Sequence, residues 1–165
     1  MKVFKEEQRF TQTWLIVLLA ISTLIPLIIV VSEYLKGKTT LNELITVVVI
    51  MFFATSLIFF FKLTTKIDQI GIHYQFFPFH FSFKTIPWDD ISKAHVRNYD
   101  AISEFGGWGL KGGSLWSSEK GKAINVSGNI GIQLVLKNNK KLLIGTQKEN
   151  AAKQVLSTYN NKINE

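Results

Sequence analysis

The sequence contains no cysteine, which excludes a disulfide framework and any zinc site with thiolate ligands. Histidine is also scarce. The three histidines, His73, His80 and His95, lack the spacing of a metal site such as H-x-x-x-H. We therefore expect ordinary surface or half-buried histidines, no metal site and no cofactor. A chain without cysteine is also compatible with a reducing compartment.

A catalytic constellation is missing as well. Residues 107–112 spell G-x-G-x-x-G, but no helix pattern follows them and no βαβ unit surrounds them. We interpret these glycines as turn residues that let Trp108 pack. The neighbouring Asp89 and Asp90 would point to opposite faces of a strand, which is poor geometry for a carboxylate pair and favours a turn or cap. The sequence therefore predicts no catalytic residue and a protein that is not an enzyme.

Long runs of like charge are absent too. The net charge is +7, and from Leu63 onward 13 Lys and Arg against 8 Asp and Glu leave +5, spread along the segment. Such a domain on a membrane is attracted to anionic lipid head groups, although the same charge also serves solubility alone. Between Tyr74 and Trp88 aromatic and basic residues interleave. The dense phenylalanines there indicate a core, or a face against a membrane or partner, rather than base stacking, so we expect no nucleic-acid partner.

The sequence does contain two apolar runs of 18 residues without a charged side chain, at 14–31 and 44–61. At about 1.5 Å per residue, each helix would extend roughly 27 Å, close to the ~30 Å hydrocarbon core of a bilayer. The runs predict transmembrane helices at about 14–32 and 42–61, within an N-terminal anchor of residues 1–62. A cleaved signal peptide is disfavoured because the first run is too long and no small-x-small site follows. A soluble hairpin would show a polar face.

The residues flanking the apolar runs predict an orientation. Three basic residues precede the first run, Lys36 and Lys38 lie in the link, and Lys62 and Lys66 follow the second run. The positive-inside rule then favours both termini in the cytoplasm. We expect a multi-pass protein of the cell membrane, inner or plasma, whose integral partner is the lipid bilayer.

Proline and small residues inside the runs bear on helix packing. Pro26 interrupts the first run, and Ser22 and Thr23, one turn earlier, are candidates to satisfy the carbonyl that it frees. Few small residues are available to pack against other membrane helices. They are Ala20, Ser22, Thr23, Ala54 and Ser56.

Short β-type segments follow the anchor and predict a soluble domain over residues 63–165. Aromatic and β-branched residues or strict alternation mark the expected strands. These strands are residues 70–77, 79–84, 92–99, 125–127, 131–136 and 141–144, with a glycine-rich loop at 106–121. The alternation over 79–84 would set Phe79, Phe81 and Phe83 on one face.

The last hairpin and the last helix can be predicted in detail. A three-residue loop after Leu136 would gather the apolar residues of both strands on one face, with Asn139 in the left-handed conformation. Thr146 followed by Glu149 fits a helix capping box. A helical apolar stripe then indicates a C-terminal helix that packs on a sheet. The stripe consists of Ala152, Val155 or Leu156, Tyr159 and Ile163.

Several segments behind the anchor carry a resemblance to a known family. They are IPWDDI at 86–91, EFGGWG at 104–109, VSGN at 126–129 with GIQL at 131–134, and GTQ at 145–147. Over about residues 62–160 the chain resembles the bacterial pleckstrin-homology-like (PH-like) domains that follow one or two membrane helices. The resemblance implies an α+β domain, in which a strongly bent antiparallel sheet or barrel of seven strands is capped by a C-terminal helix. It implies no single activity and no catalytic residues.

These observations favour a membrane-anchored, non-enzymatic binding or scaffolding module that engages lipid head groups or a membrane protein partner. The candidate contact residues are Trp108, with its glycine loop, and Lys137, Lys140 and Lys141 at the hairpin tip. Solvation alone also explains lysines at a turn. The alternative function is a structural accessory subunit of a larger membrane complex, such as a transporter or an enzyme.

Overall fold

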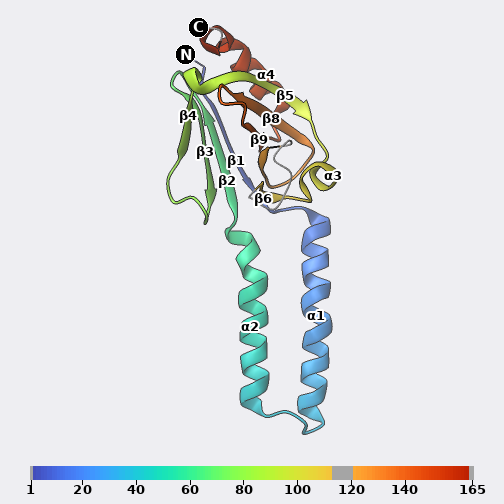
Figure 1. The fold of residues 1–165 in the computed structure, drawn as a ribbon. Helices are drawn as coiled ribbons and strands as arrows, with labels where there is room; N and C mark the ends of the chain where they lie inside the picture. The colour runs from blue at the N-terminus through green and yellow to red at the C-terminus, as the bar shows by residue number, and fades with distance from the viewer. Residues whose placement is uncertain (1, 113–120, 164–165) are drawn as a thin grey trace. The chain divides into compact units, whose positions relative to one another are not determined.

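The computed structural model describes residues 2–112 and 121–163 and comprises two compact units. One unit combines Met1–Arg9 with Lys62–Glu165, and the other is Phe10–Phe61. The fold is mixed α+β, with two long apolar helices, two β-sheets and a C-terminal helix (Figure 1). The sequence predicts an anchor over all of residues 1–62, whereas the first nine residues group with the β-sheets in the structure. Of the glycine-rich loop, residues 113–120 lie outside the described residues.

Helices α1 (Thr13–Leu35) and α2 (Leu41–Phe60) are both long and apolar enough to cross a membrane, as the sequence predicts. A reciprocal cap starts α2 directly after the short link. The Thr40 hydroxyl accepts a hydrogen bond from the Glu43 N–H at 3.3 Å, and the Glu43 carboxylate accepts one from the Thr40 N–H at 2.7 Å.

The hydroxyl groups near Pro26 do not have the predicted role. Pro26 frees the carbonyl of Ser22, four residues earlier. The Ser22 and Thr23 hydroxyls instead donate to the carbonyl of Leu19, at 2.9 and 2.7 Å. Thr23 Oγ1 also lies 3.1 Å from Thr55 Oγ1, so this hydroxyl joins α1 to α2.

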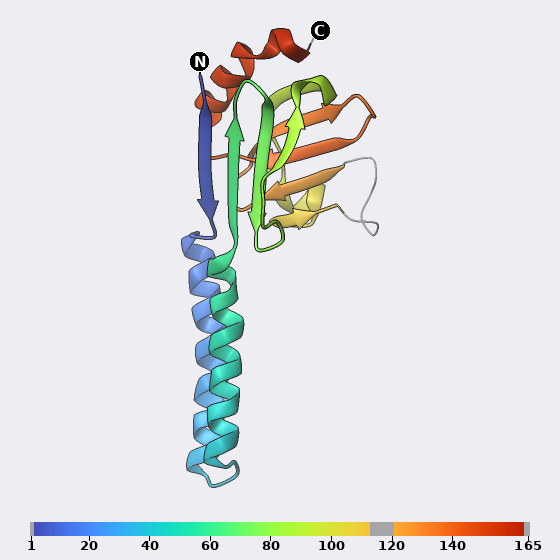
Figure 2. The same cartoon turned by 90° about the vertical axis from the view of Figure 1, so that its left-hand side faces the viewer.

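The first sheet has the strand order β1-β2-β3-β4, and every pair is antiparallel. Its strands are β1 (Phe4–Arg9), β2 (Lys62–Ile67), β3 (Gly71–Phe77) and β4 (Lys84–Pro87). β1 and β2 are neighbours, although both helices lie between them in the sequence (Figure 2). Arg9 pairs with Lys62, so the two residues next to the helical unit are direct partners. The helical hairpin is therefore an insertion into a β-hairpin.

The second sheet has the order β5-β8-β9-β7-β6. Its strands are β5 (Ile91–Asn98), β6 (Gly109–Lys111), β7 (Lys122–Asn125), β8 (Ile130–Leu136) and β9 (Lys141–Gly145). β7 pairs with β9 in parallel, and the other pairs are antiparallel. A one-turn 3₁₀ helix, Trp88–Asp90, joins the two sheets and contains the turn aspartates, as predicted.

Residues 78–83 do not continue a strand, contrary to the prediction. Pro78 has no N–H for a sheet hydrogen bond, and the His80 N–H bonds back to the carbonyl of Phe76 at 2.8 Å. This contact closes a turn, and β4 begins only at Lys84. The three phenylalanines that alternate here are exposed in a loop instead of lying on a strand face.

The β8–β9 hairpin confirms the predicted three-residue loop. Val135 pairs with Lys141, and the N–H of Leu136 bonds to the carbonyl of Lys140 at 2.9 Å. Asn139 has a φ of 64°, the left-handed conformation that such a loop requires. The resulting register aligns Ile132 with Ile144 and buries both, because one face of the hairpin is in the core.

The C-terminal helix α4 (Glu149–Thr158) packs against β5, β1 and β8 and buries the predicted apolar stripe. Its aromatic end residue Tyr159 stacks on Trp88, with ring centroids 5.2 Å apart, and its hydroxyl donates to the carbonyl of Lys2 at 2.7 Å. The predicted capping box is wrong, because Lys148 is the N-cap and makes no side-chain cap bond. Thr146 instead donates to the Glu6 carboxylate at 2.6 Å.

Buried polar side chains on β1 hold this strand to the rest of the β unit. Glu6 is 3% exposed, and its second oxygen accepts from the N–H of Gln147 at 2.7 Å. Gln8, also buried, donates to the carbonyl of Gly145 at 2.8 Å. These bonds join β1 to the segment between β9 and α4, far away in the sequence. Glu6 is therefore the main polar attachment of the N-terminal strand.

We expect Glu6→Ala to lower the free energy of unfolding by about 2–3 kcal/mol, because charge-assisted bonds are lost and buried donors remain. Glu7→Ala is the matched control. Glu7 lies on the other face, about half exposed, in surface ion pairs that contribute at most about 1 kcal/mol. Urea unfolding of the full chain in detergent, followed by tryptophan fluorescence, measures both. Equal losses would contradict the assigned role.

The turn between β2 and β3 is built on the buried carboxylate of Asp68. Its Oδ1 accepts from the N–H of Ile70 at 2.9 Å and from His73 Nε2 at 3.1 Å, and Oδ2 lies 2.8 Å from Lys66 Nζ. Burial alone would raise the pKa of this carboxyl. The hydrogen bonds outweigh burial and hold its pKa well below the usual range.

This lowered pKa predicts a pH dependence of stability. The Asp68 carboxylate stabilises the fold fully above its unfolded-state pKa of about 3.9, and the contribution is lost as the pH falls further toward the folded-state value. Asp68→Asn should therefore lower the urea midpoint at pH 7 and flatten its decline below about pH 4. Asp89→Asn, which removes an exposed carboxyl, should keep the wild-type decline. A steep acid decline in both variants would refute the assignment.

Candidate functional site

A short helix and its capping residue form one wall of the candidate site. Helix α3 (Ala101–Phe105) follows Asp100, whose Oδ1 accepts hydrogen bonds from the N–H groups of Ser103 and Ile102, both at 2.9 Å. These backbone bonds lower the pKa of Asp100, so this carboxylate is ionised at neutral pH. Gly106 ends the helix with a φ of 70°, which glycine adopts without a Cβ clash.

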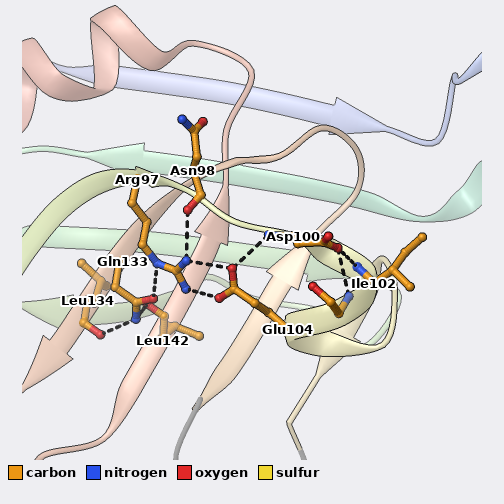
Figure 3. Close-up of polar contacts among 9 residues, drawn as sticks. Arg97, Asn98, Asp100, Ile102, Glu104, Gln133, Leu134 and Leu142 are labelled. Atoms are coloured by element: carbon orange, nitrogen blue, oxygen red, sulfur yellow. Dashed lines mark hydrogen bonds and ion pairs between the residues drawn. The ribbon is translucent and has the colours of Figure 1, made fainter.

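Arg97 connects α3 to the second sheet (Figure 3). Its guanidinium binds both carboxylate oxygens of Glu104, at 3.1 and 2.8 Å, and donates from Nε to Gln133 Oε1 at 3.1 Å. Gln133 is buried and donates in turn to backbone carbonyls of β8 and β9. The bidentate geometry fixes the direction of both charged groups. The network therefore holds α3 in one position on the sheet.

Trp108 forms another part of the wall. Its indole Nε1–H donates to the carbonyl of Gly128 at 3.3 Å, and the N–H of Gly109 donates to the buried side chain of Asn125 at 2.9 Å. Around Trp108 lies an open hollow of about 570 Å³, which we call the Trp108 pocket. It is lined by residues 98–102, Glu104, Trp108 and the turn residues Gly128 and Asn129.

The lining of the Trp108 pocket is amphipathic. The Trp108 indole and the exposed Ile102 side chain supply apolar surface, and Asp100 supplies an ionised carboxylate, whereas the Glu104 carboxylate is paired with Arg97. Tyr99 lines the pocket with a buried side chain, and its Oη is enclosed beside Asn125. Burial raises the pKa of this phenol, so it stays neutral. The pocket thus suits a ligand with apolar groups, hydrogen-bonding groups and positive rather than negative charge.

The structure separates the predicted contact residues into two places. Trp108 bonds to Gly128, just before β8 begins, whereas Lys137, Lys140 and Lys141 lie just after β8 ends. A strand of this length spans about 20 Å. The three lysines are exposed on the hairpin loop, which we call the lysine tip, residues 137–141. Trp108 and the lysine tip therefore form two surfaces, and the contact role of each stays a prediction.

An arrangement of hydroxyl, imidazole and carboxylate groups was not predicted from the sequence. It joins Thr85 on β4, His73 on β3 and Asp68 in the β2–β3 turn. His73 Nδ1 lies 2.8 Å from Thr85 Oγ1, and His73 Nε2 lies 3.1 Å from Asp68 Oδ1. His73 and Thr85 are cross-strand partners, so correct pairing of these segments would have found them. Such groups can transfer a proton. The Asp68 carboxylate, however, also binds Lys66 and the N–H of Ile70, which commits it to the turn.

The histidines occupy the half-buried positions that the sequence predicts. His73 belongs to the Asp68 turn, and His80 accepts a hydrogen bond from the N–H of Phe76 at 3.3 Å. Among residues 2–112 and 121–163, no group of three or more His, Asp or Glu side chains is arranged to hold a metal ion.

We expect Glu104→Ala to lower the free energy of unfolding by about 1–3 kcal/mol, because the partly buried Arg97 guanidinium loses its bidentate partner. Glu149→Ala is the control. It removes an exposed i,i+4 pair with Lys153, which contributes about 0.5 kcal/mol or less. The urea midpoint of the full chain measures both variants. A Glu104→Ala midpoint equal to the control would show that the network does not fix α3.

Comparison of the chain with protein-family models, curated proteins and solved structures gave no match.

Proposed function

We propose that this protein is a membrane-anchored, non-enzymatic binding module that holds a segment of a membrane-protein partner in the Trp108 pocket. The observation that carries this proposal is the pocket lining, in which an indole and an aliphatic side chain lie beside the fixed Asp100 carboxylate and backbone groups. A polypeptide segment offers apolar side chains together with N–H and C=O groups, and buried aromatic residues are frequent centres of protein interfaces.

A lipid head group is the weaker candidate for this pocket. A phosphate would meet the ionised Asp100 carboxylate, and the Arg97 guanidinium is already bound by Glu104. A lysine or arginine of a partner would meet complementary charge. An apolar neighbour of that residue would pack on Trp108. The preferred ligand is therefore a basic and apolar peptide segment.

The lysine tip is a second candidate surface, for anionic head groups or an acidic protein surface. Its three exposed lysines lie within five residues, Lys137 and Lys140 in the loop and Lys141 at the start of β9, and concentrate positive charge. The N–H of Lys137 bonds to the carbonyl of Asp90, shortly after β4 ends at Pro87. Pro87 pairs with Gly71, at the end of the first sheet opposite to Lys62. The lysine tip thus offers an electrostatic contact to an acidic protein surface or to anionic head groups.

The β unit is proposed to be a PH-like domain of a bacterial membrane protein. Two mostly antiparallel sheets and a C-terminal helix that packs on them support the proposal. The described residues form nine strands instead of the implied seven, and the parallel β7–β9 pair also departs from an antiparallel sheet. The strand before α1 accounts for one of the additional strands.

We further propose a multi-pass location in the cell membrane, inner or plasma, with both termini in the cytoplasm. Two spans bring the chain back to the side on which it began. The pairing of β1 with β2 supports this, because the strand before α1 shares a sheet with the strand after α2. The basic residues around the helices favour the cytoplasmic side.

A structural accessory role in a transporter or enzyme complex is the alternative function. Neither α1 nor α2 buries a residue within the chain, so their side chains are available to other membrane helices. In this case the partner would contact the helices and not the Trp108 pocket.

Site-specific photo-cross-linking in the native host tests the proposal. A benzophenone amino acid replaces Ile102, which is 67% exposed beside the pocket, and Ile70, which is 60% exposed in the β2–β3 turn, is the control position. We expect a discrete protein adduct from position 102 but not from position 70. Trp108→Ala should reduce it at least fivefold, and mass spectrometry should find a basic and apolar segment at the cross-link.

A lipid adduct at position 102, or no adduct that depends on Trp108, would overturn the pocket proposal. The same cross-linker at Ile28 on α1, 67% exposed, tests the alternative. A protein adduct from position 28 alone, unchanged by Trp108→Ala, would favour the accessory-subunit function.

A further inference from the structure

The loop between β3 and β4, residues 78–83, exposes three phenylalanines that the fold does not use as core. Phe81 is 84% exposed, Phe79 is 59% and Phe83 is 46%. Large apolar side chains gathered on a surface indicate a contact with a partner or a membrane. We call this segment the phenylalanine loop.

Strand register determines where the phenylalanine loop lies. β1 ends at Arg9, β2 begins at Lys62 and β3 ends at Phe77, and Lys62 pairs with both Arg9 and Phe77. The three strand ends therefore lie at one end of the first sheet, and Figure 2 shows the β3–β4 loop at this end. Because β3 runs toward this end, the loop continues beyond it.

Both connections to the apolar helices leave from the same end of the sheet. α2 ends at Phe60, and only Phe61 separates it from Lys62. Two residues of extended chain reach at most about 7 Å, and paired strands lie about 5 Å apart. Phe77 is thus within roughly 12 Å of the end of α2 by connectivity and register alone. If α2 spans a bilayer, a residue within this distance of the end of α2 is able to reach the polar interface.

Three backbone groups of the phenylalanine loop, the His80 and Phe81 carbonyls and the His80 N–H, have hydrogen-bond partners within the protein. Gln75 Nε2 donates to the carbonyls of His80 and Phe81, at 3.2 and 3.0 Å. The Phe76 backbone bonds to His80 in both directions, through its carbonyl at 2.8 Å and its N–H at 3.3 Å. Polar groups that are already paired lose little on leaving water. These bonds lower the cost of moving the His80–Phe81 part of the loop into a less polar layer.

The charges around the loop suit the same layer. Residues 77–83 contain no acidic residue and no lysine or arginine. Burial, with a contribution from the Lys84 ammonium, lowers the pKa of His80, which keeps this imidazole neutral at pH 7. Lys84 borders the loop at the start of β4, and Arg9 and Lys62, which share ion pairs with Glu7, lie at the neighbouring strand ends. An uncharged aromatic segment with basic neighbours is typical of residues that lie at a membrane interface.

We infer that the phenylalanine loop inserts Phe79, Phe81 and Phe83 into the interfacial layer of the bilayer that holds α1 and α2. This inference rests on the proposed membrane anchorage. The β unit would then have a lipid contact of its own besides its two connections to the helices. Such a third contact restricts rotation of the β unit about these connections.

Spin-label accessibility tests the inference, and the cysteine-free chain is a ready background for single labels. Phe81→Cys, Ile70→Cys and Ile50→Cys each receive a nitroxide, in the full chain reconstituted into phosphatidylcholine–phosphatidylglycerol nanodiscs. Ile70 is the matched water-side control, because its turn lies at the other end of β2 and β3, roughly 17 Å from Lys62. Ile50, on α2 and 61% exposed, reports the anchor.

We expect the label at position 81 to collide more often with oxygen than with a water-soluble nickel chelate, as at position 50, and the label at position 70 to show the reverse. Equal behaviour at positions 81 and 70, with position 50 in lipid, would overturn the inference and leave the anchorage intact. Protection of position 81 from both reagents would indicate a protein contact and also overturn it. A water-exposed position 50 would overturn the anchorage itself.

Discussion

The pairing of β1 with β2 is the constraint on which the rest of this structure depends. The two strands are separated by the whole helical hairpin, yet Arg9 and Lys62 are direct partners. The entropic cost of bringing two strands together increases only slowly with the length of the chain between them. Specific contacts can therefore offset the cost of the helical insertion. Glu6 and Gln8 provide such contacts, since both are buried and bond to the segment between β9 and α4. The N-terminal strand thereby joins the first sheet to the C-terminal helix.

This constraint also organises the functional surfaces. Both helix connections and the phenylalanine loop lie at one end of the first sheet, whereas the lysine tip is bonded to Asp90, beyond the opposite end. The Trp108 pocket lies near the start of β8 and the lysine tip at its end. In the proposed function, the phenylalanine loop meets lipid, and the Trp108 pocket and the lysine tip meet polypeptide partners. Its candidate surfaces are thus distinct in both position and charge.

The candidate site shows why only part of it could be predicted. An aromatic residue between glycines, as at Trp108, is a local signal that the sequence displays directly. The partners that give the pocket its character are not local: Arg97 bonds to Gln133, 36 residues away. Thr146 illustrates the same limit. Its spacing to Glu149 matches a capping box, but its hydroxyl bonds to Glu6, because a buried carboxylate needs a partner more than an exposed helix end does.

The sequence alone determined the elements whose signals are local. Apolar length determined α1 and α2, alternation and turn chemistry determined the β8–β9 hairpin with Asn139 in the left-handed conformation, and helical periodicity determined the buried face of α4. Only the tertiary structure decided that residues 4–9 form a strand, that the alternating phenylalanines at 79–83 form an exposed loop, and that Asp100, Glu104 and Trp108 share a pocket. These features depend on strand pairing and burial between segments that are distant in the sequence. No periodic pattern within a single segment predicts such contacts.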